Sequence, residues 1–182
     1  LEPSSAMISV IAVSPDFMQD STVIVARTTG NLLISTDGGT QWNDKGIPAG
    51  AIIYDITIAP GNAKEIFLAT SDGVYYSNDR GDTFTRKPAN LPVEIINNIA
   101  VSPNYLIDKT VFCTTITHAV YKSTNGGNSW VLHKSGAVIT GQSPSILNEF
   151  SELQISNTFS TDRAVFFSTY DVFSVSGWQS RL

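Results

Sequence analysis

The chain has 182 residues, of which 42% are hydrophobic and 15% are charged, as in an ordered globular domain with a sizeable core. The formal net charge of −5 and the scattered Lys and Arg residues argue against a nucleic-acid surface, which needs clustered cations. The single cysteine, Cys113, excludes an internal disulfide and a zinc site built from cysteines. No stretch approaches the roughly 18 apolar residues of a membrane span, so we expect none. Because the first residue is Leu1 and not Met, we expect a processed product or part of a longer chain.

Short apolar runs recur along the chain in groups of three. The first run of each group contains Ile11, Ile56, Ile99 or Leu153, at intervals of 45, 43 and 54 residues. A second run, rich in β-branched and aromatic residues, covers residues 23–26, 66–69, 111–114 and 165–168. A third run follows a polar turn, over residues 32–34, 74–76, 120–121 and 172–173. Such runs predict antiparallel strands, and a repeat of this length predicts a propeller or a solenoid.

In the first three groups the third run leads into the pattern S-x-[D/N]-x-G-x-x-[W/F]. The residues that fit this pattern are Ser35, Asp37, Gly39 and Trp42, then Ser77, Asp79, Gly81 and Phe84, then Ser123, Asn125, Gly127 and Trp130. The pattern predicts a tight turn, in which the Asp or Asn oxygen accepts turn amides, Gly adopts a left-handed conformation and the aromatic ring packs on the sheet. In this pattern the sequence resembles the Asp-box (BNR) repeat family, which includes sialidases, sortilin-type receptors, xyloglucan-degrading enzymes and photosystem assembly factors.

The resemblance implies an all-β fold, a β-propeller of four-stranded antiparallel blades. We expect one propeller segment over residues 1–182, with blade units near residues 8–50, 51–92, 93–140 and 150–182. Gly177, Trp178 and Gln179 replace the Asp-box turn of the fourth unit, so we expect about three strands there. The family usually has more blades, which favours a fragment or a ring completed by other protein. We therefore expect a protein partner, or self-association that completes the propeller.

Blade geometry distributes the loops between two faces. Loops between the first and second strands share one face with the Asp-box turns, and loops between the second and third strands share the other with the crossovers between blades. Propeller ligands most often bind on that second face or in the central channel. The third crossover is the longest, and we interpret part of it as a possible recognition loop, with a plain long loop as the alternative. Its candidate residues are Gln142, Ser143, Asn148, Glu149 and Phe150.

The most regularly patterned polar residues have a structural interpretation. Asp37, Asp79 and Asn125 occupy the same position of the Asp-box turn. Asn at the third position keeps a hydrogen-bond acceptor but not a negative charge. This exchange favours a turn-forming role over a role in catalysis or cation binding.

Metal binding is not favoured by the remaining polar residues. The loops after three of the first runs contain an aromatic residue and end in Asp20, Asp108 or Asp162. We interpret these carboxylates as caps of turns and not as calcium ligands, because they belong to separate blades. The two histidines, His118 and His133, lack a third zinc ligand. We therefore predict no metal and no cofactor.

The resemblance to sialidases implies that a sialidase would bind the substrate carboxylate with three arginines from different blades. Arg80 lies inside an Asp-box turn and no Arg-Ile-Pro motif is present, so the arginine triad cannot be assembled. A glycosidase with two carboxylates stays open. The carboxylates expected in or near the second face are Asp55, Asp72, Glu94, Glu149 and Glu152.

The favoured function is therefore a non-catalytic Asp-box module that binds or scaffolds protein or glycan. The alternative is a segment of an Asp-box glycoside hydrolase, sialidase-like or xyloglucanase-like, whose catalytic residues lie mostly outside this chain. The resemblance also implies an extracellular, periplasmic or cell-surface location.

Overall fold

The computed structural model describes residues 7–46, 50–87, 91, 95–117, 119–135, 149–170 and 177–181. The first sheet contains β1 (Ile8–Val13), β2 (Val23–Arg27), β3 (Leu32–Ser35) and β4 (Asn43–Lys45). The second contains β5 (Ile53–Ile58), β6 (Ile66–Thr70), β7 (Gly73–Ser77) and β8 (Thr85–Arg86). The third contains β9 (Ile96–Val101), β10 (Val111–Thr115), β11 (Ala119–Ser123) and β12 (Val131–Ser135). The fourth contains β13 (Glu149–Ile155), β14 (Ala164–Tyr170) and β15 (Gly177–Arg181). Three one-turn helices are α1 (Phe17–Asp20), α2 (Tyr105–Asp108) and α3 (Phe159–Asp162).

Each sheet is an antiparallel meander whose strands pair in chain order. The predicted four-stranded blade is confirmed for the first three sheets, and the fourth has three strands within the described residues. Gly177, Trp178 and Gln179 belong to β15, where Trp178 stands opposite Phe167, because pairing with β14 satisfies backbone groups that a turn would leave open. The expected run at residues 172–173 lies outside the described residues.

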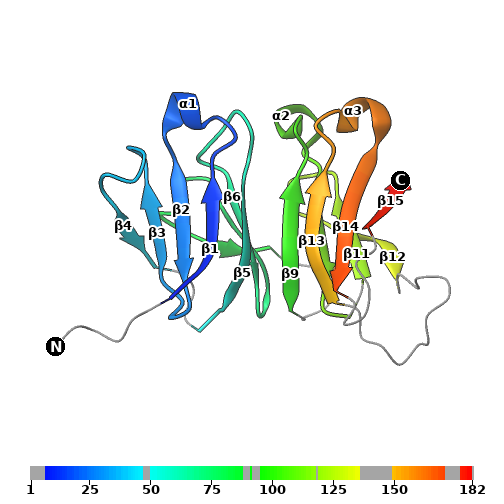
Figure 1. Ribbon diagram of the computed structural model, residues 1–182, viewed down its shortest axis with the longest axis horizontal. Helices are drawn as coiled ribbons and strands as arrows, with labels where there is room; N and C mark the ends of the chain where they lie inside the picture. The colour runs from blue at the N-terminus through cyan, green and yellow to red at the C-terminus, as the bar shows by residue number, and fades with distance from the viewer. Residues whose placement is uncertain are drawn as a thin grey trace.

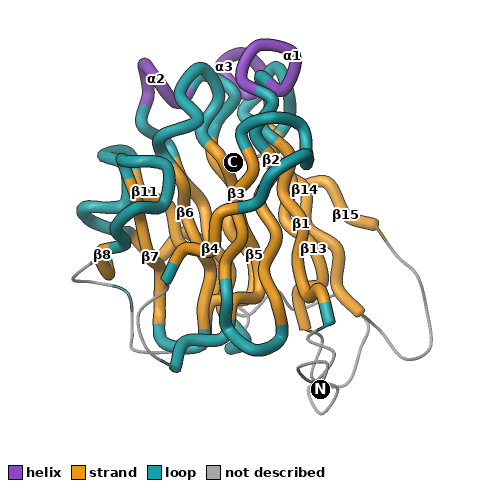
Figure 2. The backbone as a smooth tube through the Cα atoms, turned by 90° about the vertical axis from the view of Figure 1, so that its left-hand side faces the viewer, coloured by secondary structure: helices purple, strands orange, loops and turns teal. Residues whose placement is uncertain are grey.

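The four sheets stand side by side as propeller blades. The first strand of each sheet is innermost, and β1 packs beside β5, β5 beside β9, and β9 beside β13. Figures 1 and 2 show α1, α2 and α3 gathered at one end of the sheets. The Asp-box turns lie at the same end, since Gly38 N donates to Ser21 O at 3.0 Å and Gly126 N donates to Lys109 O at 2.9 Å. The expected distribution of these loops is therefore confirmed.

The hydrophobic core lies in layers between successive blades. Alternation along each strand gives a blade two faces, one toward the preceding blade and one toward the next. The layer between the first two blades includes Ile24, Leu32, Ile56 and Ile66. The next layer includes Phe67, Val74, Ile99 and Trp130. The last includes Phe112, Val120, Leu153 and Phe159.

Each inner strand carries an irregularity at the same place. The pairing of the first and second strands shifts by one residue just before Val10, Asp55, Asn98 and Glu152. Such a bulge inserts one extra residue and reorients the side chains that follow it. Because the bulge recurs, these four residues are structurally equivalent, although their chemistry differs from blade to blade.

A carboxylate links the second blade to the third. Glu65 accepts hydrogen bonds from the hydroxyl groups of Tyr76 at 3.0 Å and Tyr105 at 2.9 Å, and from Lys109 Nζ at 3.1 Å. Burial alone would raise the pKa of Glu65, but these donors outweigh it and hold the pKa below its usual value. Tyr105 also packs edge-on against Phe67, with ring centroids 5.7 Å apart.

The second blade differs from the others in the loop after its first strand. It has no one-turn helix there, and a tight turn at Gly61 takes the place of that helix. Asp16 of the first blade accepts a hydrogen bond from Gly61 N. A Cβ added to Gly61 would stand 2.5 Å from the side chain of Leu106, in α2 of the third blade. Both neighbouring blades therefore contact this turn.

The substitution Tyr105→Phe tests the link through Glu65. It keeps the ring in the apolar layer but removes one donor, so we expect the free energy of unfolding to fall by about 1–2 kcal/mol in chemical denaturation. Tyr54→Phe is the matched control, because Tyr54 is exposed on β5. An equal effect of the two substitutions would contradict a role for the hydroxyl group.

Candidate functional site

The three Asp-box turns share one hydrogen-bond pattern. The serine hydroxyl accepts the N–H of the box glycine at 2.9 Å from Gly39, 2.7 Å from Gly81 and 2.8 Å from Gly127. The Asp or Asn oxygen accepts a second N–H at 2.9 Å in each turn, from Gln41, Thr83 and Ser129. Asn125 therefore forms the same turn as Asp37 and Asp79.

These turns use their polar groups internally. Hydrogen bonds from Thr83 and Ser77 lower the pKa of Asp79 to about 2. The indole Nε1 of Trp130 donates to Gly127 O at 3.1 Å, and the ring is buried against the second blade. Because these acceptors bind N–H groups of their own turns, they stabilise the scaffold.

The loops that follow β1, β9 and β13 also use their carboxylates locally. Asp20, Asp108 and Asp162 each accept a serine hydroxyl at 2.6 Å and a backbone N–H at 2.8–2.9 Å. This geometry stabilises the turn. Within the described residues no three His, Cys, Asp or Glu side chains gather closely enough to hold a metal ion.

A pocket of about 370 Å³ lies where the inner strands of the blades meet. Its lining includes the second residue after the first strand of every repeat, namely Pro15, Pro60, Pro103 and Asn157. Residues of β5, β9 and β13 complete the lining. All four repeats therefore contribute to one axial pocket, which is the central channel of the propeller.

Asp55 is the one titratable residue among the described residues that line the axial pocket. Its Oδ1 accepts the N–H of Ile56 at 2.8 Å, and its Oδ2 accepts the N–H of Ile99, in the third blade, at 2.9 Å. Burial raises the pKa of Asp55 to about 6, and the negative charge of Glu152 adds to the shift while the two N–H donors oppose it. The channel thus contains a carboxyl group that ties β5 to β9.

The other candidate carboxylates do not join Asp55 in the pocket lining. Asp72 accepts hydrogen bonds from Thr70 and Tyr75 in the turn between β6 and β7. Glu152 is exposed on β13 and accepts a hydrogen bond from Gln154 at 3.0 Å. Glu94 lies outside the described residues.

The candidate recognition loop is described only at its end. Glu149 and Phe150 are the first residues of β13, paired with Tyr170 and Thr169. Gln142, Ser143 and Asn148 lie outside the described residues. His118 does so as well, whereas His133 lies on β12 with its ring edge-on to Phe112 at 6.3 Å.

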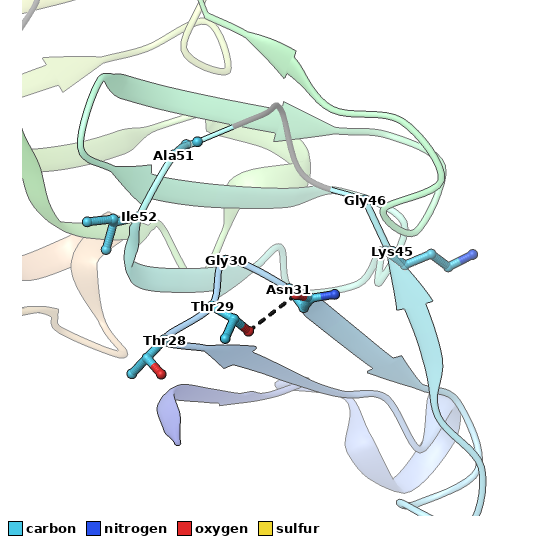
Figure 3. A pocket seen from close by; sticks show the side chains of 9 residues that line it. Thr28, Thr29, Gly30, Asn31, Lys45, Gly46, Ala51 and Ile52 are labelled. Carbon is cyan, nitrogen blue, oxygen red and sulfur yellow. Dashed lines mark hydrogen bonds between the residues drawn. The ribbon is translucent and has the colours of Figure 1, made fainter. Parts of the chain in front are cut away.

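A second pocket, of about 300 Å³, lies at the other end of the first blade (Figure 3). The turn between β2 and β3 and the crossover to the second blade form its walls, with Thr28, Thr29 and Asn31 on one side. Thr29 donates to Asn31 Oδ1 at 3.2 Å, and Asn31 donates to Asp44 at 2.9 Å. This pocket belongs to the face on which the sequence predicts ligands, and two of its polar side chains, Asn31 and Lys45, pair with Asp44 and Asp82, which do not line it.

The family model of Sortilin-Vps10, described as sortilin, neurotensin receptor 3, matches residues 30–169. The chain belongs to the Sortilin-Vps10 family. No curated protein matches the sequence of this Sortilin-Vps10 chain. No helix in the described part of the chain is long and apolar enough to cross a membrane.

Solved structures resemble this Sortilin-Vps10 chain across nearly its whole length. YCF48 bound to D1 peptide matches with a TM-score of 0.62 and 14% identity, covering 98% of this chain and 56% of that chain. An ancestral GH74 enzyme matches with a TM-score of 0.73 and 17% identity, covering 97% and 23%. The GH74 xyloglucanase from Xanthomonas campestris matches with a TM-score of 0.65 and 16% identity, covering 96% and 29%. The chain thus spans about half of YCF48 and about a quarter of the GH74 enzymes, and the likeness establishes the propeller fold.

Ser77→Ala tests the Asp-box turn. The substitution leaves the buried N–H of Gly81 without its acceptor, so we expect unfolding free energy to fall by about 1–3 kcal/mol. Asn78→Ala, at the exposed neighbouring position, should leave stability unchanged. Thermal and denaturant unfolding of both variants would measure the difference, and an unchanged Ser77→Ala variant would contradict the structural role.

Asp55→Asn tests the channel carboxyl group through the pH dependence of stability. The folded-state pKa of about 6 exceeds the ordinary value of 3.8, so the native state binds the proton more tightly than the unfolded chain. The contribution of Asp55 to stability should therefore decrease as pH rises from 4 to 6, by at most about 3 kcal/mol, and stay constant above that window. Denaturant titrations of the unaltered chain and of Asp55→Asn at several pH values give the difference in unfolding free energy between the two proteins. The contributions of the other titrating groups cancel in this difference. A difference that does not change with pH would contradict the assignment.

Proposed function

We propose that this chain is a non-catalytic propeller module that binds a segment of polypeptide at the axial pocket. The observation that carries this proposal is the pocket itself, to which the same position of all four repeats contributes. Its walls are mainly proline and aliphatic residues with few polar side chains, as in many ligand pockets. The inner strands are also edge strands of their sheets, the kind of strand that an extended peptide can pair with or contact.

The comparisons support a peptide as the ligand class. YCF48, whose structure contains a bound D1 peptide, shares the propeller fold with this chain. The net charge of −5 and the two carboxylates near the channel, Asp55 and Glu152, favour peptides that carry Lys or Arg beside apolar residues. Glycan is the second ligand class in this proposal, because GH74 xyloglucanase shares the same fold.

The proposal includes contact with other protein and a location outside the cytoplasm. The family description names a receptor, which supports an extracellular, periplasmic or cell-surface location. Exposed apolar residues of the first blade, such as Ile11 and Val13, support protein contact, through a partner or through self-association.

The second candidate function is a segment of an Asp-box glycoside hydrolase. The raised pKa of Asp55 favours this alternative, because a general acid has to hold its proton near neutral pH. Both oxygens of Asp55 already accept backbone N–H groups, however, and no other carboxylate lines the described part of the pocket. Hydrolysis would therefore need residues outside this chain.

Binding at the axial pocket is tested with a displayed library of random peptides, followed by titration of the enriched peptides. We expect Gln154→Trp, which places an indole at the pocket wall, to weaken their binding by at least about tenfold, since it fills space that the ligand uses. Asn78→Trp is the matched control, because Asn78 is exposed in an Asp-box turn and does not line the axial pocket. This variant should bind as the unaltered chain does.

The same preparation separates the two functions. Enrichment of peptides that Gln154→Trp no longer binds supports the binding module, and equal binding by both variants would place the site elsewhere. Release of sugar from xyloglucan or sialosides, lost in Asp55→Asn, would overturn the non-catalytic assignment.

A further inference from the structure

The bulge in β5 directs two consecutive side chains to the same side of the second blade. Ile53 and Ile56 both belong to the layer between the first and second blades. In a regular strand these two residues would face opposite sides, and the register shift between Ile53 and Asp55 removes this difference. Tyr54 and Asp55 therefore both lie on the side of the third blade, in agreement with the hydrogen bond from Ile99 N–H to Asp55 Oδ2.

Tyr54 is accessible at this bulge. It is 39% exposed, and its side chain forms no hydrogen bond or ring contact within the described part of the chain. The pairs at the equivalent bulges of the other blades are Ser9 with Val10, Asn97 with Asn98, and Ser151 with Glu152. An aromatic residue beside a carboxylate is therefore a property of the second blade and not of the repeat.

Asp55 has capacity for further hydrogen-bond donors. An ionised carboxylate can accept about four hydrogen bonds, and the backbone N–H groups of Ile56 and Ile99 provide two. The ion pairs found within the described residues do not include Asp55. The inner strands β1, β5, β9 and β13 contain no Lys or Arg. These strands therefore supply no cation to the carboxylate.

The junction between two blades does not require a negative charge at this position. The equivalent residues are Val10 in the first blade and Asn98 in the third, and both are neutral. Burial raises the pKa of Asp55 to about 6, because water is lost and no neighbouring cation compensates the charged form. Perturbed carboxyl groups of this kind cluster at functional sites. The charge of Asp55 therefore fits a role in ligand recognition better than a role in blade packing alone.

We propose that Tyr54 and Asp55 form a cation subsite at one end of the axial pocket, which takes the guanidinium or ammonium group of a ligand. The cation donates to the remaining lone pairs of Asp55, and the ring of Tyr54 attracts the same charge. Pro60 lines the pocket beyond the other end of β5, so the apolar part of the ligand extends in that direction. This inference rests on the proposed function, because it names the group that the axial pocket recognises and the residues that recognise it.

The subsite is tested by NMR titration of the 182-residue chain with butylguanidinium. The amide signals of Ile56 and Ile99 report on the site, because both N–H groups donate to Asp55. We expect saturable shifts of both signals, with an affinity at least about tenfold higher than that for butylurea, a neutral compound of the same shape. Equal affinities for the two compounds, or no shift of these signals, would overturn the proposal.

Substitutions assign the preference to the two side chains. Asp55→Asn keeps the size of the side chain but removes its charge, so the preference for butylguanidinium should fall to about twofold or less. Tyr54→Ala should weaken butylguanidinium binding by about threefold, and Tyr54→Phe, which keeps the ring, should retain more affinity than Tyr54→Ala. Asp44→Asn is the matched control, since Asp44 is an exposed carboxylate on β4 that does not line the pocket.

The controls keep folding and recognition apart. Circular dichroism verifies that each variant folds, and Tyr54 is exposed, so its substitution tests the subsite even where Asp55→Asn lowers stability. A preference that persists in Asp55→Asn, or that falls equally in Asp44→Asn, would overturn the proposal.

The same samples separate this inference from the proposed function. Saturable binding of butylguanidinium beside Asp55, without enrichment of any peptide from the library, would support the subsite and contradict peptide binding. Enriched peptides that lack Lys and Arg, and that Gln154→Trp no longer binds, would support peptide binding and overturn the subsite.

Discussion

The burial of each blade's apolar face against the next blade is the interaction on which the whole structure depends. A sheet of three or four short strands cannot bury both of its faces by itself, so its stability comes from its neighbours. Ile24, Phe67 and Phe112 belong to three successive layers of this kind. The axial pocket and the Glu65 cluster both follow from stacking the same unit around one axis.

The stacking separates the roles of two sets of residues. Asp-box residues such as Ser77 and Asp79 are nearly invariant among the repeats because each turn needs the same acceptors. The position after the inner-strand bulge carries Val10, Asp55 or other residues, because no turn constrains it. Chemistry in the channel can therefore differ between blades while the outer scaffold stays the same.

The sequence predicts the parts of this fold that depend on local chemistry. The Asp-box pattern identified the turns around Asp37 and Asn125, and the apolar runs identified the strands, because turn amides and alternating side chains are properties of short segments. The sequence did not predict the contact of Glu65 with Tyr105, since these residues lie 40 positions apart and neither belongs to a repeated pattern. The loss of the Asp-box pattern at Gly177 indicated an incomplete fourth unit, but the pairing of this segment with β14 becomes apparent only in the structure.

The candidate site shows the same division. The list of carboxylates from the sequence included Asp55, but its position in the channel and its bond to Ile99 depend on how two blades meet. Likewise, the axial pocket could be expected from the propeller fold, whereas its proline-rich lining becomes apparent only when the four repeats are brought together.

The tight turn at Gly61 has a consequence for the order of the repeats. It is held by Asp16 from one side and covered by Leu106 from the other, so the second blade fits between these two neighbours and not between any two blades. The repeats look interchangeable in the sequence, yet their order is fixed by such contacts. Duplicating, deleting or transposing a blade would break the contacts of a specific pair of junctions. The order of the repeats is therefore constrained by these contacts.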